Sequence, residues 1–288
     1  MFGECHAHII MDAVNYKHAV NRHQTGVDES VIHAHFSAYQ KLGIRFVRDG
    51  GDSLGVSRRA REIAPSYGID YRTPIFAIHK NGHYGGIVGR GFDTLPEYTA
   101  LVREVKKQGG DFIKIMTTGI MDFDTDGHIT GDALPYALVK EMVHIAHEEG
   151  FAVMTHTNGA GPVYDALLAG VDSVEHGNYM DDECILAFSQ SEAVWVPTVT
   201  VVPNLIGCGR FTDTVLESIW QEAGDNIRKA WKAGVTMALG SDAGAYLVPH
   251  GQGLLDELRR FKSILSGERD LEQRLELGER KICLLYTS

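Results

Sequence analysis

The sequence alternates between short apolar segments and longer amphipathic segments along its length. The apolar segments have the length and composition of buried strands. They are Glu4–Ile9, Ile44–Arg48, Asp70–Ile78, Phe112–Met116, Ala152–Thr155, Ser173–Glu175, Val194–Val199 and Thr236–Leu239. The amphipathic segments have helical periodicity and include Glu29–Leu42, Leu95–Gln108, Pro135–Glu149, Pro162–Ala169 and Thr214–Ala233. Strands that alternate with helices form parallel sheets, so eight such units predict an α/β fold, a (β/α)8 TIM barrel.

The length and composition agree with one large domain. The chain has 288 residues, of which 44% are hydrophobic and 23% are charged, as in ordinary globular proteins. We interpret residues 1–267 as the barrel and residues 268–288 as a helix-like tail. The final segment KICLLYTS, residues 281–288, resembles neither a strand nor a packed helix. We expect its last residues to be either non-native sequence or a frayed natural terminus.

Charge and cysteine content narrow the choice of partner and compartment. A net charge of −11 argues against nucleic acid or an anionic membrane surface as the main partner. No apolar run reaches 18 residues, so no membrane span is expected. The four cysteines are widely spaced, which favours a reducing, cytoplasmic compartment. These properties predict a small-molecule substrate and leave open whether the chain forms a homo-oligomer.

Residue types that bind metals recur at the carboxyl ends of the predicted strands. They are His6, His8, Lys114, His156, His176 and Asp242. In a barrel these strand ends converge on one site. His6 and His8 lie two residues apart, so both point to the same side of their strand. Each short motif is a weak signal by itself, but their recurrence at successive strand ends predicts a metal site.

Lys114 is unusual because it lies between Ile113 and Ile115 in a segment that reads as a buried strand. Lysine is almost never fully buried without a partner, and burying its ammonium costs several kcal/mol. The residue is therefore either a structural lysine that is ion-paired or reaches solvent, or part of the site.

The order His-x-His, Lys, His, His and Asp on a barrel resembles the amidohydrolase superfamily. The motifs DFIKIMTTG (111–119), MTHTNGAG (154–161), DSVEHG (172–177) and LGSDAG (239–244) resemble its imidazolonepropionase-like and Xaa-Pro dipeptidase-like branch. The resemblance extends from about Glu4 to Leu265. Members of that branch usually build a small β-sandwich from segments before and after the barrel, so this sequence resembles the barrel fragment of a longer protein.

The resemblance implies a site with two divalent ions, for which Zn2+ suits the ligand types. It implies His6, His8 and Asp242 as ligands of the first ion, His156 and His176 as ligands of the second, and Lys114 as a CO2-derived carbamate that bridges both. Asp242 would act as the general base on a water held between the ions. The implied reaction is hydrolysis of an amide or peptide bond in a small substrate such as a dipeptide or an N-acyl amino acid.

Two other functions compete with this interpretation. The first is a mononuclear deaminase or cyclic-amidine hydrolase, as in relatives of the same superfamily whose sites lack a bridging lysine. Lys114 favours the binuclear site over this alternative. The second is a non-catalytic scaffold, but every ligand type is present, which argues against a lost active site.

Contacts to the substrate are less constrained by the sequence. His83 and Tyr84, in the loop HKNGHYGG (79–86), either donate hydrogen bonds to the substrate or belong to a surface loop. Asp49 either orients a ligand histidine and the substrate or caps the next segment. The run DFDTDG (122–127) matches the start of an EF-hand loop, but Ala133 replaces the bidentate glutamate that calcium needs. We therefore expect a polar loop over the barrel mouth.

Overall fold

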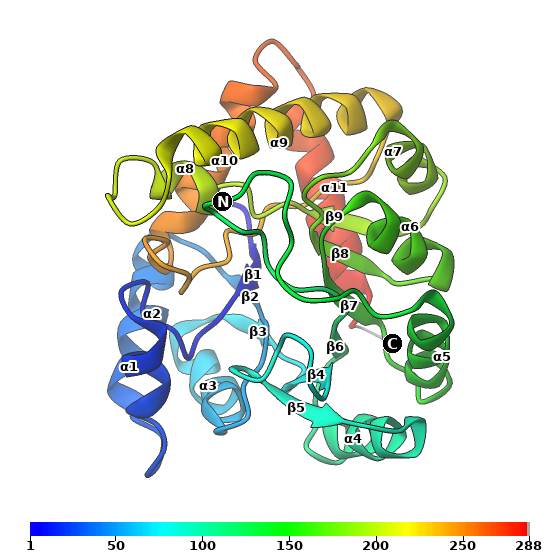
Figure 1. Cartoon of the computed structure of the whole chain (residues 1–288). Helices are drawn as coiled ribbons and strands as arrows, with labels where there is room; N and C mark the ends of the chain where they lie inside the picture. Colours follow the sequence, from blue (N-terminus) through cyan, green and yellow to red (C-terminus); the bar gives the residue numbers. More distant parts are fainter. Residues whose placement is uncertain (287–288) are drawn as a thin grey trace.

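The computed structural model describes residues 1–286, which form a ring of parallel strands surrounded by helices (Figure 1). The first sheet has the order β1-β2-β3, and the second has the order β5-β4-β6-β7-β8-β9. The strands are β1 (Glu4–Ala7), β2 (Phe46–Asp49), β3 (Asp70–Arg72), β4 (Ala77–Lys80), β5 (Gly89–Phe92), β6 (Ile113–Met116), β7 (Val153–Thr157), β8 (Ser173–His176) and β9 (Val194–Val196).

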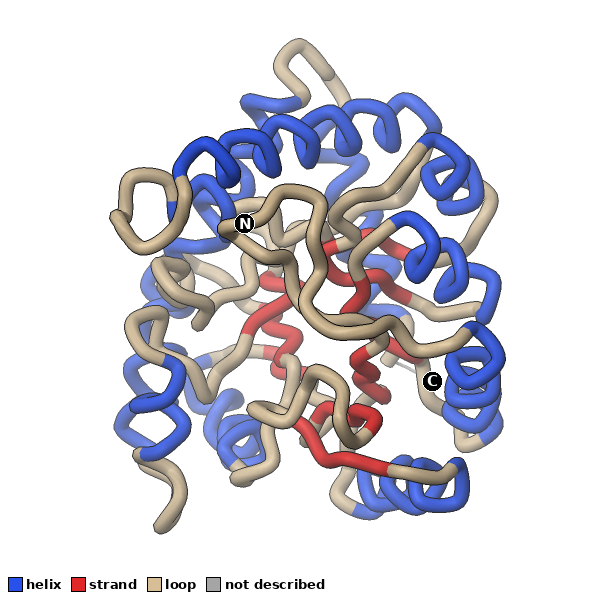
Figure 2. The backbone as a smooth tube through the Cα atoms, viewed as in Figure 1, coloured by secondary structure: helices blue, strands red, loops and turns tan. Residues whose placement is uncertain are grey.

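The helices lie outside the strands, as Figure 2 shows. They are α1 (Tyr16–Asn21), α2 (Glu29–Lys41), α3 (Val56–Ile63), the 3-10 helix η1 (Ala64–Tyr67), α4 (Leu95–Lys107), α5 (Tyr136–Glu148), α6 (Ala160–Ala169), α7 (Asp182–Ser189), α8 (Val201–Leu205), α9 (Asp213–Ala233), α10 (Gln252–Ile264) and α11 (Leu271–Leu284). Across residues 1–286, no helix combines the length and apolar character needed to cross a membrane.

The two sheets are joined by residues 236–243, where an eighth strand was predicted. The backbone N–H of Ala238 donates to Trp195 of β9 over 3.0 Å, and the N–H of Cys5 in β1 donates to Leu239 over 3.0 Å. A third hydrogen bond runs from His8 N–H to the carbonyl of Ala243 over 2.8 Å. These contacts put the segment between β9 and β1, so the predicted α/β barrel architecture is confirmed.

One predicted strand, Asp70–Ile78, is broken into β3 and β4. Between them, Pro74 has no backbone N–H to donate, and Ile75 adopts a left-handed conformation with φ of 67°. The chain therefore leaves the strand geometry here: β3 pairs with β2, whereas β4 pairs with β6. The prediction of one continuous strand is wrong at this point, and β5, which pairs with β4, was not predicted.

The tail contains a helix, as its helix-like sequence suggested, but the final segment differs from its prediction. Helix α11 continues to Leu284, and the side chain of Ile282 is fully buried against Cys5 and its neighbours. The buried residues of α11 are Leu271, Leu275, Gly278 and Ile282. Residues at this spacing lie along one face of a helix. The expectation that the final segment forms no packed helix is therefore wrong as far as Leu284. Residues 287–288 lie outside the described residues, and the boundary at 267 stays a prediction.

Candidate active site

All six predicted ligand residues line one cavity at the carboxyl ends of the strands. His6 lies in β1 and His8 directly after it, and Lys114 lies in β6. The others follow in chain order, with His156 in β7, His176 at the end of β8, and Asp242 after the eighth strand position. The cavity has an empty volume of about 780 Å3, open mouth included.

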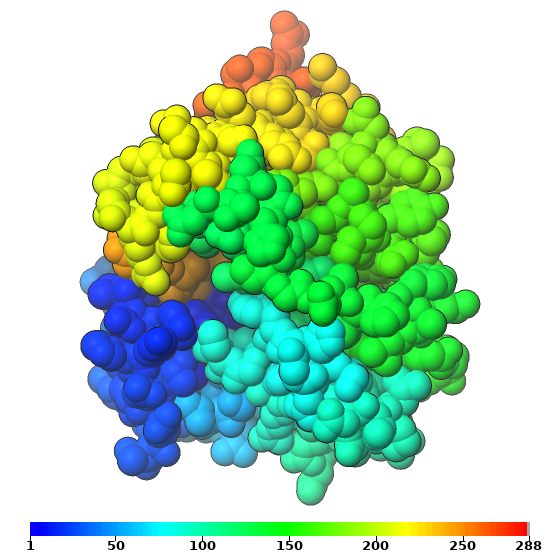
Figure 3. Space-filling view, in the orientation of Figure 1, coloured from blue at the N-terminus to red at the C-terminus, as the bar shows by residue number. Residues whose placement is uncertain are grey.

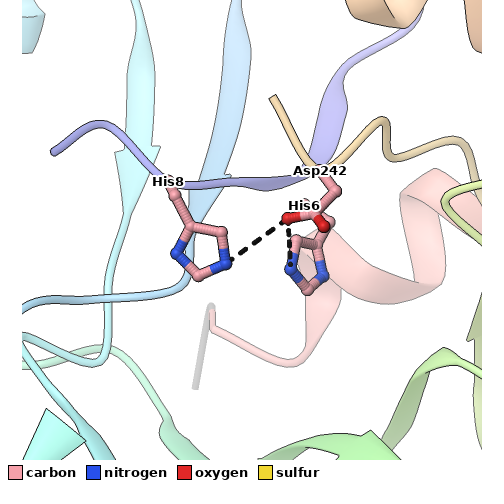
Figure 4. Close-up of side chains that lie close together, drawn as sticks. All are labelled: His6, His8 and Asp242. Carbon is pink, nitrogen blue, oxygen red and sulfur yellow. Dashed lines mark ion pairs between the residues drawn. The ribbon is translucent and has the colours of Figure 1, made fainter. Parts of the chain in front are cut away.

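His6, His8 and Asp242 form the most compact group within this cavity (Figure 4). Nε2 of His6 lies 3.5 Å from Oδ1 of Asp242, and Nε2 of His8 lies 3.4 Å from the same oxygen. One ligand atom from each residue falls within 4.8 Å of the others. Two imidazoles and a carboxylate at these separations form a suitable half-site for a divalent ion such as Zn2+.

His156 and His176 continue the group toward the other side of the cavity. The ring centroids of His176 and His6 are 5.0 Å apart, and those of His156 and His176 are 4.6 Å apart. Nε2 of His156 donates to the carbonyl of Gly119 over 3.1 Å, and Nδ1 of His176 lies 2.7 Å from the hydroxyl oxygen of Thr198. Each ring thus has one nitrogen bound within the protein, which leaves the other nitrogen free to act as a ligand.

Several buried polar atoms of the group have no hydrogen-bond partner among the residues described. They are Nε2 of His6, Nδ1 of His8, Nζ of Lys114 and Oδ1 of Asp242. Buried polar atoms in native proteins are almost always paired, so four unpaired atoms in one cavity need an explanation. Imidazole nitrogens and carboxylate oxygens that lie close together without hydrogen-bond partners fit bound metal ions.

Burial sets the protonation of the histidines. Burial, together with the charge of Lys114, lowers the pKa of His8 and of His156 from 6.5 to about 3. The pKa values of His6 and His176 are also held well below their usual range, mainly by burial. The imidazoles are therefore neutral near pH 7, which is the form that binds metals.

Lys114 is only 1% exposed. Burial lowers the pKa of its amine from 10.5 to about 8, against the opposing effect of the Glu175 carboxylate. The structure thus confirms that the lysine is buried, and the snorkelling alternative is excluded. A buried amine with a lowered pKa and no hydrogen-bond partner within residues 1–286 is a suitable nucleophile.

Three residues at the strand ends adopt left-handed backbone conformations. The φ angles are 68° at His176, 50° at Thr198 and 60° at Asp242. Such conformations are costly for residues other than glycine and persist only where the surroundings impose them. At these three strand ends around one cavity, the surroundings therefore hold the backbone in place.

Sequence reasoning missed the residues that hold the ligands in place. Glu175 is fully buried, and its Oε2 accepts a hydrogen bond from Nδ1 of His6 over 2.6 Å. Its Oε1 accepts from the buried guanidinium of Arg48 over 2.7 Å. The signal was available, because both residues are charged and lie in predicted buried strands, as Lys114 does.

Two further buried carboxylates support the loops that follow the last strands. Glu4 accepts hydrogen bonds from the N–H of Ser241 over 2.7 Å and from its hydroxyl over 2.6 Å, directly beside Asp242. Glu257 of α10 accepts from the N–H groups of Val199 and Thr200 over 3.0 and 2.7 Å. Neither residue touches the cavity, so both position neighbouring residues.

The three residues predicted to contact the substrate lie in different places. Tyr84 lines the cavity, and its ring centroid lies 4.9 Å from that of His156. His83 is not part of the cavity wall, and its Nδ1 lies 3.1 Å from the carbonyl oxygen of Asp132. Asp49 is fully buried away from the cavity and accepts hydrogen bonds from the N–H groups of Ile9 and Gly51. Asp49 therefore lies outside the cavity wall, and its role stays a prediction.

The acidic run at 122–127 belongs to the loop between β6 and α5, which lies over the barrel mouth (Figure 3). Asp124 accepts hydrogen bonds from the N–H and the hydroxyl of Thr212, and Asp126 accepts one from Ser218. These carboxylates therefore fasten the loop to residues next to α9 and within it. This arrangement agrees with the polar loop expected from the sequence.

The parallel barrel, with a group of histidines at the ends of its strands, has the fold type of the metal-dependent hydrolases. The amidohydrolase family matches residues 29–264. The chain belongs to the amidohydrolase family.

Among curated relatives, the ochratoxinase of Aspergillus niger is 27% identical over 190 residues, which are 64% of this chain and 38% of the relative. An uncharacterised protein of Mycobacterium tuberculosis is 26% identical over 174 residues, which are 57% of this chain and 45% of that protein. The matched region thus spans less than half the length of these relatives.

Solved structures show the same fold. A Xaa-Pro dipeptidase with methionine bound in its active site aligns with a TM-score of 0.70 at 23% identity, over 96% of this chain and 75% of its own. A prolidase complexed with N-methylphosphonate-L-proline aligns with a TM-score of 0.77 at 21% identity, over 100% and 75%. The structure of A. niger ochratoxinase aligns with a TM-score of 0.77 at 19% identity, over 95% and 69%.

Proposed function

We propose that this site hydrolyses a C–N bond, of the amide or peptide type, in a small substrate. The observation that carries the proposal is the convergence of six ligand-type residues on one cavity, with buried polar atoms of four of them unpaired within the described chain. Family membership and the likeness to ochratoxinase, a prolidase and a Xaa-Pro dipeptidase support the reaction class.

The residues present fit two divalent ions. His6, His8 and Asp242 would hold the first, because their ligand atoms already lie within 4.8 Å of one another. His156 and His176 would hold the second through the ring nitrogens that the protein leaves free. Two ions bound there, most fittingly Zn2+, would lower the pKa of a water and polarise the substrate carbonyl.

Lys114 would complete the site as a carbamate shared by both ions. Its neutral Nζ adds to the carbon of CO2: an N–C bond forms, one C=O π bond opens onto oxygen, and one N–H proton leaves to solvent. Burial favours the neutral amine that this step requires, since it lowers the pKa of Lys114 to about 8. The product is an anion in place of an unpaired amine, which suits a cavity lined by ligand histidines.

Asp242 would serve as the general base. Its carboxylate would take a proton from the attacking water and pass it to the leaving nitrogen. Burial raises the pKa of this carboxyl from 3.8 to about 6, although the Lys114 charge opposes the rise. Without bound ions, a carboxyl group with this pKa is mostly ionised near pH 7, which is the form that a general base requires. Dipeptides and N-acyl amino acids are the substrate classes to examine first.

The first test is metal content. Elemental mass spectrometry on the chain purified with zinc and bicarbonate is expected to find two ions per chain, and Lys114→Ala is expected to lower both the zinc content and the rate of amide hydrolysis. Short carboxylic acids are expected to restore part of the activity of Lys114→Ala. Two ions in Lys114→Ala with undiminished activity would refute the bridging role.

The alternative is a mononuclear deaminase or cyclic-amidine hydrolase. The observation that favours it is that, among residues 1–286, His6, His8 and Asp242 form the one group of three or more His, Cys, Asp or Glu residues whose ligand atoms all lie within 4.8 Å of one another. One ion per chain in the wild-type protein, with deamination or cyclic-amidine hydrolysis in place of amide hydrolysis, would support this alternative over the binuclear site.

A further inference from the structure

The walls of the cavity above the ligands are apolar on several sides. They are built from loops that follow different strands, and they include Met11, Ile87, Ile120, Met121, Phe123 and Val202. Two of these residues are also exposed at the surface, Ile87 by 36% and Ile120 by 38%. Apolar side chains therefore extend from the interior of the cavity to its rim.

The ring of Phe123 is held in this wall by neighbouring contacts. Its centroid lies 5.2 Å from that of Phe211 in an edge-to-face arrangement, and it packs with Met121 and Val202 in one hydrophobic cluster. The same loop is fastened by Asp124 to Thr212. Figure 3 shows this loop over the mouth, next to the segment that leads into α9. The apolar wall is thus part of the packed structure.

Charge in the cavity is confined to the floor. Of the described residues that line it, Lys114 is the one lysine or arginine and Asp242 is the one carboxylate, and both belong to the proposed metal site. The two asparagines in the wall are uncharged and bond to each other, since Oδ1 of Asn158 accepts from Nδ2 of Asn178 over 2.9 Å. A substrate carboxylate held between these walls, away from the floor and its proposed ions, would meet apolar side chains and, among the described residues, no cation.

We propose that the preferred substrate is an amide whose groups on both sides of the scissile bond are uncharged and apolar, such as an N-acyl arylalkylamine or a carboxylate-blocked peptide. This inference rests on the proposed function, and within amide hydrolysis it favours neutral amides over the dipeptides and N-acyl amino acids named there. An ionised group moved from water into an apolar wall costs free energy unless an opposite charge meets it. An aromatic or branched aliphatic group gains free energy in the same place.

The test compares two substrates that differ only in one carboxylate, N-acetylphenylalanine and N-acetylphenethylamine. Both contain a single amide bond and the same phenyl group. With the zinc-loaded chain we expect kcat/KM to be at least about tenfold higher for the neutral amide, because the acid has no counter-charge in the wall. Equal values, or a preference for the acid, would overturn the inference and leave the proposed function standing.

A second test changes the charge of the cavity rim, where the first changed the charge of the substrate. Ile120→Arg places a cation at the rim and is expected to shift the acid-to-neutral ratio of kcat/KM toward the acid by about tenfold. Leu186→Arg, on the exposed part of α7, is the control and is expected to leave the ratio unchanged. An unchanged ratio in Ile120→Arg would count against the inferred position of the substrate. Failure to hydrolyse either amide with two ions bound would instead refute the proposed function.

Discussion

Glu175 accepts a hydrogen bond from Nδ1 of His6 over 2.6 Å while its other oxygen accepts from Nη2 of Arg48 over 2.7 Å. All three side chains are fully buried. The hydrogen bond fixes which nitrogen of His6 carries the proton and leaves Nε2 to face Asp242. The buried Glu175–Arg48 ion pair thereby orients the ring of His6, a proposed metal ligand. Carboxylates that bond to ligand histidines commonly have this role.

Replacing this carboxylate tests its two roles together. Glu175→Gln keeps the shape but leaves the Arg48 charge without its partner, so we expect the free energy of unfolding to fall by about 3 kcal/mol. Zinc affinity should fall by about 10- to 100-fold because His6 loses its acceptor. Ser173→Ala removes another hydrogen bond to Glu175 and is the control. Denaturant titrations and zinc competition would measure both effects, and unchanged zinc affinity in Glu175→Gln would contradict the supporting role.

Lys114 offers a prediction in which stability and activity move in opposite directions. Lys114→Met removes a buried amine that lacks a partner within residues 1–286. We expect the metal-free variant to be more stable than the metal-free wild type by about 1–2 kcal/mol, while hydrolysis is nearly lost. Urea titrations in the presence of a chelator would measure the first effect. A loss of stability in Lys114→Met would indicate a structural role for the amine.

The convergence of the six proposed ligands on one cavity was predictable because strand ends converge in a barrel, so His156 and His176 needed only correct strand assignments. The supporting carboxylates were not predictable in the same way. Glu257 meets Val199 across 58 positions of sequence, and Glu4 meets Ser241 across 237. Hydrophobic periodicity indicates which face of an element is buried, but it does not indicate which polar groups meet inside.

The C-terminal tail and the broken strand show that local sequence patterns also fail to predict where some helices and strands end. The stripe of α11 was present in the sequence but short, and polar residues separate its apolar positions. Pro74 signalled an interruption within the predicted strand, yet the left-handed conformation of Ile75 depends on the packing around it. Local patterns thus predicted the order of the elements, and tertiary contacts decided their ends.

A stacked histidine pair outside the proposed ligand set should make stability depend on pH. His35 of α2 lies 3.8 Å from His250 between ring centroids, and its Nδ1 donates to the carbonyl of Ile9 over 3.1 Å. Burial lowers the pKa of His35 from 6.5 to about 4, and the hydrogen bond to Ile9 opposes this shift. The unfolded chain therefore binds the proton first, so this contribution to stability is present above pH 6.5 and is lost as the pH falls toward 4.

The variant that isolates this contribution is His35→Phe, which keeps an aromatic ring against His250 but cannot titrate. Between pH 6.5 and 4, the metal-free wild type should lose about 1–2 kcal/mol more stability than His35→Phe. Urea titrations at several pH values would measure the difference. Parallel pH profiles for the two proteins would show that His35 does not contribute.

The close approach of Gly50 to His8 gives a steric test of the first half-site. A Cβ atom on Gly50 would lie 2.3 Å from a ring carbon of His8, which is far inside van der Waals contact. Gly50→Ala should therefore displace the imidazole and lower zinc affinity by at least about tenfold, as expected when a ligand is misplaced.

Gly161→Ala is the matched control, because its Cβ meets nothing within 4 Å in helix α6. That control should keep wild-type zinc affinity and gain about 0.5–1 kcal/mol in stability. Equal zinc affinities in the two variants, measured by competition with a chromophoric chelator, would mean that His8 does not bind the ion.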